Sequence, residues 1–291
     1  MGGGKGISSL SDEELLNQAL RLINEGKSVA LAIVVSKEGS GPRDVGSKML
    51  IDEDGNTYGT LGGGSFERHV VNEAVKAIRE GRPRMIKYSF TGRQVSGAVD
   101  TGLICGGILT VYIDVLRPSK RVIIFGTGRV GKPVTEIFRF LKFRVVIADP
   151  KPELVSEDYI PHADVRITGS VDEIASKLKS IIREGDIVLV LHGEVETDYR
   201  MVKELMESKA NFIGLLGSRR KVTEFIKKLV SEGIPKEVIK SKLRAPIGID
   251  LGSDKPEEIA ISIAAEALSY INNVEPKHLS IVSNVIDKLR V

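Results

Sequence analysis

The sequence predicts an α/β protein whose C-terminal domain is a doubly wound parallel sheet and whose smaller N-terminal domain is of the α+β type. In residues 121–149, two short apolar runs enclose a glycine-rich turn and a helical pattern. From there to residue 271, strand-like and helical segments alternate regularly, which is typical of a parallel sheet with helices on both faces. This unit begins near residue 120 of 291, so we expect a separate domain before it.

The composition is that of a globular protein without a strong charge preference. The chain has 42 basic and 39 acidic residues, a net charge of +3 and 42% hydrophobic residues. This balance argues against general nucleic-acid binding, and no apolar run approaches the ~20 residues of a membrane helix. The start of the chain has no signal-peptide-like apolar stretch, and a single cysteine excludes an intrachain disulfide. We therefore expect a cytoplasmic protein with neither a nucleic acid nor a membrane as its partner.

Residues 1–117 are assigned to the N-terminal domain. Ser11 and Glu14 have the spacing of a capping box at the start of its first helix. Residues 54–56, Asp-Gly-Asn, predict a hairpin turn, whereas residues 91–107 are glycine-rich without periodicity and predict an irregular connection. The expected elements are a helix over 11–24, a strand over 28–36, two short strands around residues 54–56, a helix over 65–79, and strands over 84–89 and 107–115.

Residues 118–291 are assigned to the C-terminal domain, which follows a linker at residues 117–120. Ser170 and Glu173 form a second capping-box pattern. Residues 273–291 are expected to form a helical tail. The expected strands cover 121–125, 143–148, 186–191 and 211–216, and the expected helices cover 129–141, 170–183, 197–208, 218–232, 235–242 and 256–271.

The glycine-rich turn of this domain, GTGRVG, has the spacing and context of a dinucleotide-binding loop in a Rossmann-like fold. Gly126 permits a tight turn, Gly128 lets the backbone approach a phosphate, and Gly131 lets the helix pack against the strand. The N–H groups at the helix start favour an anion. Asp149 ends the second apolar run, where it could accept a hydrogen bond from a ribose hydroxyl. The alternative is that the glycines serve close packing alone, because fold and ligand are separable.

A second candidate anion site follows the strand predicted at 211–216. Ser218, Arg219, Arg220 and Lys221 begin a helix there, and positive charge at a helix start is unfavourable by a few tenths to ~1 kcal/mol per group. Three bases together therefore favour a ligand, the alternative being a solvated first turn. His192 follows another strand and is either an acid–base group or a hydrogen-bonded structural residue.

Two loops of the N-terminal domain are rich in glycine and serine and poor in acidic residues. Both can offer backbone N–H groups to phosphate or another polar ligand, and an arginine in the first adds a fixed charge. Alternatively, the glycines are simply turn residues. The residues concerned are Ser40, Arg43 and Gly46 in the first loop, and Gly62, Gly63 and Gly64 in the second.

Cys105 is the chain's single cysteine and the candidate catalytic residue. It precedes Gly106 and Gly107, whose exposed N–H groups could stabilise a thiolate. A small buried hydrophobic residue is the alternative interpretation. The four histidines are scattered without ligand spacing, so no metal site is predicted.

Several sequence blocks together resemble the XdhC/CoxI family. They are EGSGPRDVGSKMLI, GTLGGGSFE and CGG in the first domain, and the glycine-rich unit, GLLGSRRK and APIGIDLGSDKPEEIAISIAAEAL in the second. The blocks are collinear and extend over about residues 12–271. The chain departs from the family pattern at two positions, since the family often has His-Asp where this chain has His192-Gly193, and His where it has Arg129.

The resemblance implies a maturation factor for molybdenum hydroxylases of the xanthine and carbon monoxide dehydrogenase type. Such proteins bind the molybdenum cofactor (molybdopterin), protect it during sulfuration by a cysteine desulfurase and hand it to the hydroxylase apoenzyme. They are usually homodimers. The resemblance also implies that Cys105 lies near the metal or the transferred sulfur. The positions matching the family's blocks are Ser40, Arg43, Gly46, Gly62–Gly64, Cys105, Gly126, Gly128, Gly131, Asp149 and Gly217–Lys221.

A chaperone without turnover of its own is therefore the first hypothesis, and two alternatives stay open. An NAD(P)-dependent oxidoreductase is supported by the glycine-rich turn and Asp149, but the chain offers no clear acid–base pair for hydride transfer. In the other alternative, the C-terminal domain has lost its nucleotide and serves only dimerisation or docking.

Overall fold

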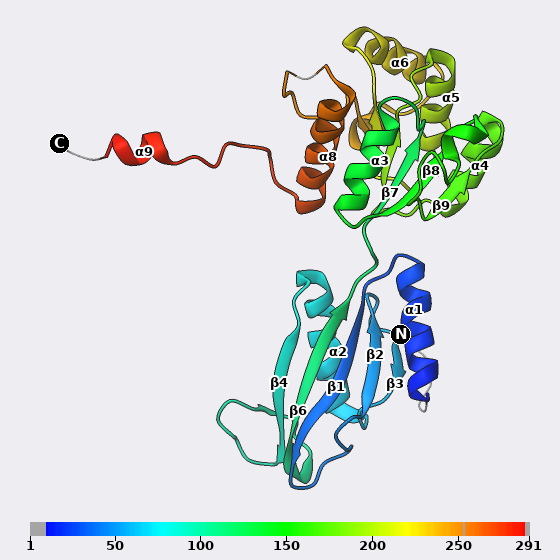
Figure 1. The fold of residues 1–291 in the computed structure, drawn as a ribbon. Helices are drawn as coiled ribbons and strands as arrows, with labels where there is room; N and C mark the ends of the chain where they lie inside the picture. Colours follow the sequence, from blue (N-terminus) through cyan, green and yellow to red (C-terminus); the bar gives the residue numbers. More distant parts are fainter. Residues whose placement is uncertain (1–9, 253, 289–291) are drawn as a thin grey trace. The chain divides into compact units, whose positions relative to one another are not determined.

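The computed structural model describes residues 10–252 and 254–288. The chain divides into two compact units, the first ending at Pro118 and the second beginning at Ser119. Within the described residues, each unit has its own six-stranded sheet (Figure 1). The predicted fold class is confirmed, since the first unit combines helices with a mainly antiparallel sheet and the second has a parallel one. Nowhere in the described ranges does a helix have the length and apolarity needed to span a bilayer.

The first unit is a largely antiparallel sheet with a helix on each face. Its elements are α1 (Asp12–Asn24), β1 (Val29–Glu38), β2 (Lys48–Asp52), β3 (Thr57–Gly59), α2 (Gly64–Glu80), β4 (Arg84–Thr91), β5 (Val99–Asp100) and β6 (Ile104–Leu116). The strands lie in the order β3-β2-β1-β6-β4-β5, with the long strands β1 and β6 at the centre. The β1–β6 pairing runs from Val29 opposite Leu116 to Glu38 opposite Ile108.

The two helices bury different faces of this sheet. Phe66, Val70 and Ala74 of α2 pack into the larger core cluster together with residues of β1, β2, β4 and β6. Leu15 and Leu22 of α1 pack with the smaller cluster on the other face. The predicted capping box at the start of α1 is confirmed, as the Ser11 hydroxyl accepts from the Glu14 N–H and the Glu14 carboxylate accepts from the Ser11 N–H.

Among its described residues, the second unit contains six parallel strands. Its elements are β7 (Arg121–Phe125), α3 (Gly131–Phe140), β8 (Arg144–Ala148), the 3₁₀ turn η1 (Pro152–Val155), β9 (Val165–Ile167), α4 (Val171–Ile181), β10 (Ile187–Val190), α5 (Val195–Met206), β11 (Phe212–Leu215), α6 (Arg219–Ser231), α7 (Lys236–Lys242), β12 (Leu243–Arg244), α8 (Pro256–Asn272) and α9 (Val282–Ile286). The spatial order β12-β11-β10-β7-β8-β9 is that of dinucleotide-binding domains. The direction of winding reverses between β7 and β10, so a ligand crevice is expected at their carboxyl ends.

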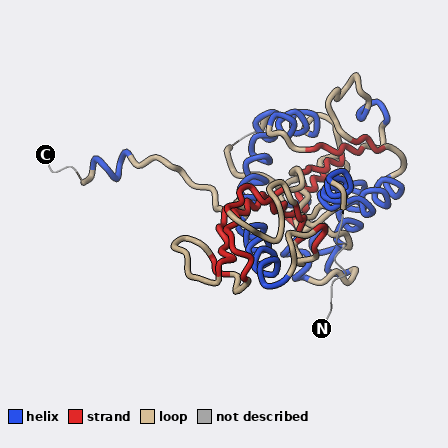
Figure 2. The backbone as a smooth tube through the Cα atoms, turned by 90° about the horizontal axis from the view of Figure 1, so that it is seen from below, coloured by secondary structure: helices blue, strands red, loops and turns tan. Residues whose placement is uncertain are grey.

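Helices cover both faces of this sheet. Helices α4, α5, α6 and α7 pack on one face through a core cluster with Ile174, Leu205 and Phe225. Helices α3 and α8 pack on the other through Phe138 and Ile263. The Ser170–Glu173 capping box opens α4 as predicted. Figure 2 shows the same elements from below.

The structure differs from the sequence-based expectations mainly in short elements. Strands β5, β9 and β12 were not predicted, and each has only two or three residues. Strand β6 begins at Ile104, inside the segment expected to be irregular. In the tail expected to be helical, the helix is confined to Val282–Ile286 among the described residues, and residues 289–291 lie outside them.

Candidate functional site

Glycine-rich loops gather at one end of the sheet in the first unit. Gly107, near the start of β6, approaches the loop after β1 so closely that a Cβ atom there would lie 2.2 Å from the Ser40 carbonyl oxygen. A Cβ atom on Gly62 would lie 2.6 Å from the Cβ of Pro42. These close approaches place three chain segments side by side. The segments carry the predicted site residues Ser40, Arg43, Gly62 and Cys105.

Arg43 and Gly46 line a polar pocket of about 260 Å³ beside the start of α1. Lys48 lines the same pocket and donates to Asp12 of α1 over 2.8 Å. The pocket therefore offers a guanidinium, an ammonium and a glycine turn to a small polar ligand. The contribution of α1 could not be inferred from the sequence, because Asp12 and Leu15 read only as ordinary first-turn and buried helix positions.

The run Gly62-Gly63-Gly64 has three successive positive φ angles, 120°, 79° and 73°, which only glycine adopts readily. Its donors are partly in use, however. One Glu67 carboxylate oxygen accepts from the backbone N–H of Leu61 and of Gly63, both over 2.9 Å. The loop thus already holds an anionic group of its own chain. A phosphate at this place would share the loop with the Glu67 carboxylate or displace it.

Cys105 lies on β6 and its side chain is exposed. This excludes the interpretation of a small buried hydrophobic residue. Ile104 beside it is 83% exposed. The thiol is therefore accessible to a ligand or a partner protein at the loop end of the first unit.

The glycine-rich turn of the second unit is positioned by close backbone contacts. Gly126 has a φ of 92°, and a Cβ atom on it would lie 2.2 Å from the His192 backbone nitrogen. A Cβ atom on Gly131 would lie 2.0 Å from the Gly126 carbonyl oxygen. A Cβ atom on Gly128, by contrast, would meet no atom within 4 Å. Packing therefore explains the first and third predicted glycines, whereas Gly128 faces open space, as a loop for phosphate approach requires.

Asp149 is buried, at 1% exposure, and organises the glycine-rich turn from the end of β8. One carboxylate oxygen accepts from the Thr127 N–H over 2.9 Å, and the other accepts from the Lys151 N–H over 2.9 Å. Both oxygens are thus engaged with the chain's own backbone. A ribose hydroxyl at this position would have to compete with, or add to, those hydrogen bonds.

The start of α6 separates the three predicted bases. Arg219 and Arg220 are exposed, and Arg220 pairs with Glu224 on the same helix over 3.2 Å. The Ser218 hydroxyl caps the helix by accepting from the Lys221 N–H over 3.3 Å. Two guanidinium groups therefore remain available to an anion at the carboxyl edge of the sheet.

Lys221 points inward and forms a buried ion pair with Asp198 of α5. Its ammonium lies 2.5 Å from the carboxylate, whose side chain is 0% exposed. The ammonium also donates to the Leu216 carbonyl over 3.2 Å, and the Gly193 N–H donates to the same Asp198 oxygen over 3.0 Å. The pair therefore ties together the loops after β10 and β11. The sequence alone does not single out Asp198, because an acid in the first turns of a helix has an ordinary explanation there.

His192 lies at the reversal point between β7 and β10. Its ring stacks on Phe125 at a centroid distance of 5.7 Å. Its Nδ1 is buried and has no hydrogen-bond partner among the described residues. A ring held by stacking beside the glycine-rich turn could exchange a hydrogen bond with a bound ligand. Within the described ranges, no group of three or more His, Cys, Asp or Glu side chains is placed to hold a metal ion.

Comparison with known proteins adds family information to this geometry. Residues 122–267 match a family model described as the XdhC Rossmann domain. Residues 22–89 match the model of the XdhC and CoxI family. The two matches fall on the second and the first unit respectively.

Three relatives are informative. The chain is 32% identical over 274 residues to "Uncharacterized protein YqeB" of Escherichia coli (strain K12), covering 91% of this chain and 49% of that protein. It is 28% identical over 158 residues to a probable xanthine dehydrogenase subunit of Bacillus subtilis (strain 168), covering 54% and 45%. It is 24% identical over 282 residues to "Molybdenum cofactor insertion chaperone PaoD" of Escherichia coli (strain K12), covering 88% and 87%. The chain thus spans about half the length of the first two relatives and most of the third.

Proposed function

Because this chain belongs to the XdhC and CoxI family, we propose that it binds the molybdenum cofactor and assists its insertion into a hydroxylase of the xanthine dehydrogenase type. The observation that carries the proposal is the carboxyl edge of the parallel sheet. There the chain presents the open Gly128 turn and the exposed Arg219 and Arg220 at a helix start. Molybdopterin carries a phosphate, which backbone N–H groups and guanidinium groups bind well. The similarity to a relative named as a molybdenum cofactor insertion chaperone supports the same role.

The proposal extends to the partners. The hydroxylase apoenzyme would receive the cofactor, and a cysteine desulfurase would act on it while it is held, with Cys105 near the metal or the transferred sulfur. We expect the protein to act as a homodimer in the cytoplasm and as an accessory protein rather than an enzyme. The exposed position of Cys105 supports a role that requires contact with a ligand or a partner.

An NAD(P)-dependent oxidoreductase is the second candidate. The strand order and the glycine-rich turn favour it, since both are typical of nicotinamide-binding domains. The buried carboxylate of Asp149 weighs against it, because both oxygens already accept backbone N–H groups of the same unit. Direct binding separates the two candidates. Purified protein is incubated with molybdenum cofactor, NAD(H) or NADP(H), and the retained ligand and any turnover are measured. Retention of nicotinamide with turnover, and no retention of molybdenum cofactor, would contradict the chaperone.

Replacing both Arg219 and Arg220 by alanine is expected to weaken cofactor retention by about 10–100-fold. This corresponds to about 1.4–2.8 kcal/mol, roughly the contribution of one hydrogen bond to a charged group, because solvent screens the two exposed arginines. Stability should change little, since both side chains are exposed. Equilibrium binding of the cofactor to the purified variant provides the measurement. The charge-matched control is Lys177→Ala with Lys227→Ala, two exposed lysines of α4 and α6 outside the loops at this edge. Equal affinities of the two double variants would show that the arginines face solvent only.

Cys105→Ser is expected to leave the melting temperature unchanged and to lower activation of the hydroxylase severalfold. The side chain is exposed, so its replacement removes no core contact, while serine lacks the nucleophilic and metal-binding character of a thiolate. The measurement is hydroxylase activity after reconstitution with apoenzyme, cofactor and each variant. Ile104→Ser, at the adjacent exposed position, serves as the control. Full activation by Cys105→Ser would assign the cysteine no role in the transfer.

A further inference from the structure

The segment after α8 exposes an unusual number of apolar side chains. From Asn273 to Lys288, every residue whose burial is described is exposed. Ile281, Val282, Val285 and Ile286 are 65%, 61%, 47% and 59% exposed. Figure 1 shows this segment leading away from α8, and in Figure 2 the segment that leads to the end marked C also extends away from the other helices and strands. Contiguous exposed apolar surface of this kind marks an interaction site.

Four apolar residues at the end of this segment, Ile281, Val282, Val285 and Ile286, share one helical face. Their positions, i, i+1, i+4 and i+5, are those that a helix presents together. The helical turn is present in the structure, since the Val285 N–H donates to the Ile281 carbonyl over 3.0 Å. Asp287 and Lys288 follow directly and place one charge of each sign at the end of the apolar face. The segment therefore has the form of a short amphipathic helix that binds in a groove.

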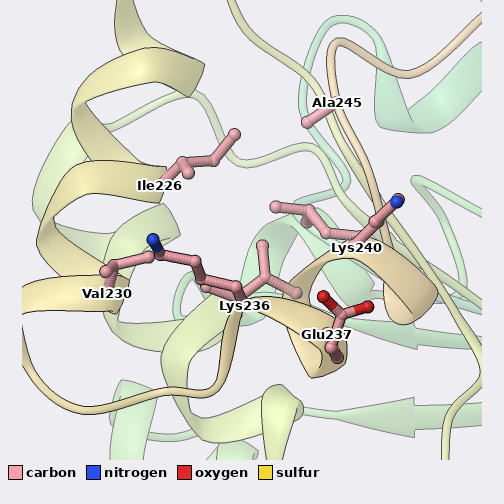
Figure 3. A pocket seen from close by; sticks show the side chains of 8 residues that line it. Ile226, Val230, Lys236, Glu237, Lys240 and Ala245 are labelled. Atoms are coloured by element: carbon pink, nitrogen blue, oxygen red, sulfur yellow. The ribbon is translucent and has the colours of Figure 1, made fainter.

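The second unit also carries an apolar groove. It has a volume of about 570 Å³ and lies between α6 and α7, beside the edge strand β12 (Figure 3). Its walls come from Ile226, Val230 and Ile239, together with Leu243 and Ala245. Ile226 is an apolar side chain in this wall and is nevertheless 37% exposed. The groove is thus an unfilled apolar surface on the same chain that has an unburied apolar segment.

The rim of the groove complements the charges of the segment. Lys236 and Lys240 line it and could pair with Asp287, while Glu237 could pair with Lys288. Within the described residues, neither of these lysines nor this glutamate takes part in an ion pair. Apolar walls with a mixed polar rim are the usual anatomy of a peptide-binding interface.

We infer that the segment of residues 274–288 of one copy binds in the α6–α7 groove of a second copy, so that two chains exchange their C-terminal segments. The structure favours a second copy over the same chain, because the segment leads away from α8 (Figure 1) and none of the residues that line the groove belongs to the segment. Reciprocal exchange uses the same two surfaces twice and closes into a dimer with two-fold symmetry. The inference gives the proposed homodimer an interface. The test of this inference measures self-association and not cofactor binding. The inference can therefore be contradicted while the proposed cofactor binding is confirmed.

The test uses two full-length variants in sedimentation experiments. Ile226→Lys damages the groove and keeps the segment, whereas Val285→Asp with Ile286→Asp damages the segment and keeps the groove. Each is expected to weaken self-association by about tenfold or more, because a charge then lies in an apolar contact. Leu20→Asp is the control, since Leu20 of α1 is 57% exposed and lies outside both surfaces. Circular dichroism confirms that each variant is folded.

Mixing the two variants gives the decisive result. One chain then retains an intact segment and the other an intact groove, so a dimer with a single exchange is expected to form in the mixture at concentrations at which neither variant associates alone. A synthetic peptide of residues 274–288 should compete with the wild-type dimer. A monomeric wild-type protein, a dimer unaffected by either variant, or a mixture that does not associate would each overturn the inference. Binding of the segment to its own groove would appear as a monomer at every concentration and would overturn it as well.

Discussion

Replacing Lys221 by alanine is expected to lower the free energy of unfolding of the second unit by about 3–5 kcal/mol, the usual cost of removing one partner of a buried ion pair. The Asp198 carboxylate is 0% exposed and would lose the ammonium that lies 2.5 Å away. Its second oxygen already lacks a hydrogen-bond partner within the described residues. Urea-induced unfolding followed by circular dichroism measures the loss, and the loops after β10 and β11 are expected to loosen with it.

Two further variants test whether the loss of stability comes from the buried Lys221–Asp198 pair and not from the removal of a surface charge. Lys221→Met combined with Asp198→Leu replaces both charges by apolar side chains and is expected to restore stability to within about 1–2 kcal/mol of the wild type. Arg220→Ala removes an exposed base one position earlier, whose side chain and that of Glu224 are 90% and 62% exposed, and is expected to change stability little. Equal losses for Lys221→Ala and Arg220→Ala would show that the Lys221–Asp198 pair is open to solvent.

Lys221 has a role that its neighbours in the sequence do not reveal. Arg219, Arg220 and Lys221 are three consecutive bases, and this pattern predicts a single anion site that includes all three. In a helix, consecutive residues point about 100° apart, so three neighbours cannot face the same ligand. The structure directs Lys221 to the buried Asp198 and leaves the arginines outside. The partner that separates them is 23 positions away in the chain, and no local pattern identifies it.

The sequence predicts those helices and strands whose apolar residues form a long, regular pattern. Apolar runs bounded by turns gave the buried strands β7, β8, β10 and β11, and amphipathic patterns with capping boxes gave α1 and α4. Strand β6 was underestimated because Gly106 and Gly107 read as turn residues. In the structure the missing side chain at Gly107 lets the backbone of Ser40 approach, so close packing and not a turn requires this glycine. The strands β5 and β12 have two residues each, which is too short for an alternating apolar pattern. They can be recognised only by their pairing with neighbouring strands.

Two carboxylates of the chain itself occupy backbone N–H groups that the sequence predicts to be available to a ligand. The sequence predicts that the glycine-rich loops offer backbone N–H groups to an anion, and the structure shows the N–H groups of Gly63 and Thr127 in such loops. They already bind carboxylates of the same chain, Glu67 and Asp149. A sequence shows that donors and acceptors are present but does not show whether they satisfy each other. The ligand roles of Gly62–Gly64 and Asp149 accordingly stay predictions, to be tested by the binding measurements.

Two alanine substitutions in the glycine-rich turn are expected to have different effects on stability. Comparing them should show which glycine is needed for folding and which for cofactor binding. Gly131→Ala places a Cβ atom 2.0 Å from the Gly126 carbonyl oxygen, a backbone atom that cannot move aside alone. Such overpacking costs about 1–3 kcal/mol or more, so α3 must shift and the melting temperature should fall. Gly128→Ala meets no atom within 4 Å and should leave stability within about 0.5 kcal/mol of the wild type.

Cofactor retention is expected to fall in both variants, but for different reasons. In Gly131→Ala the turn is displaced together with the helix, so binding and stability are lost together. In Gly128→Ala the fold is intact, and the new methyl group occupies the open space through which a phosphate would approach the backbone, so retention should drop by about tenfold or more. Thermal unfolding and equilibrium binding of the molybdenum cofactor, measured on both variants, give the comparison. If Gly128→Ala retains the cofactor as well as the wild type does, the phosphate does not lie against this turn, and the arginines of α6 become the principal anion site.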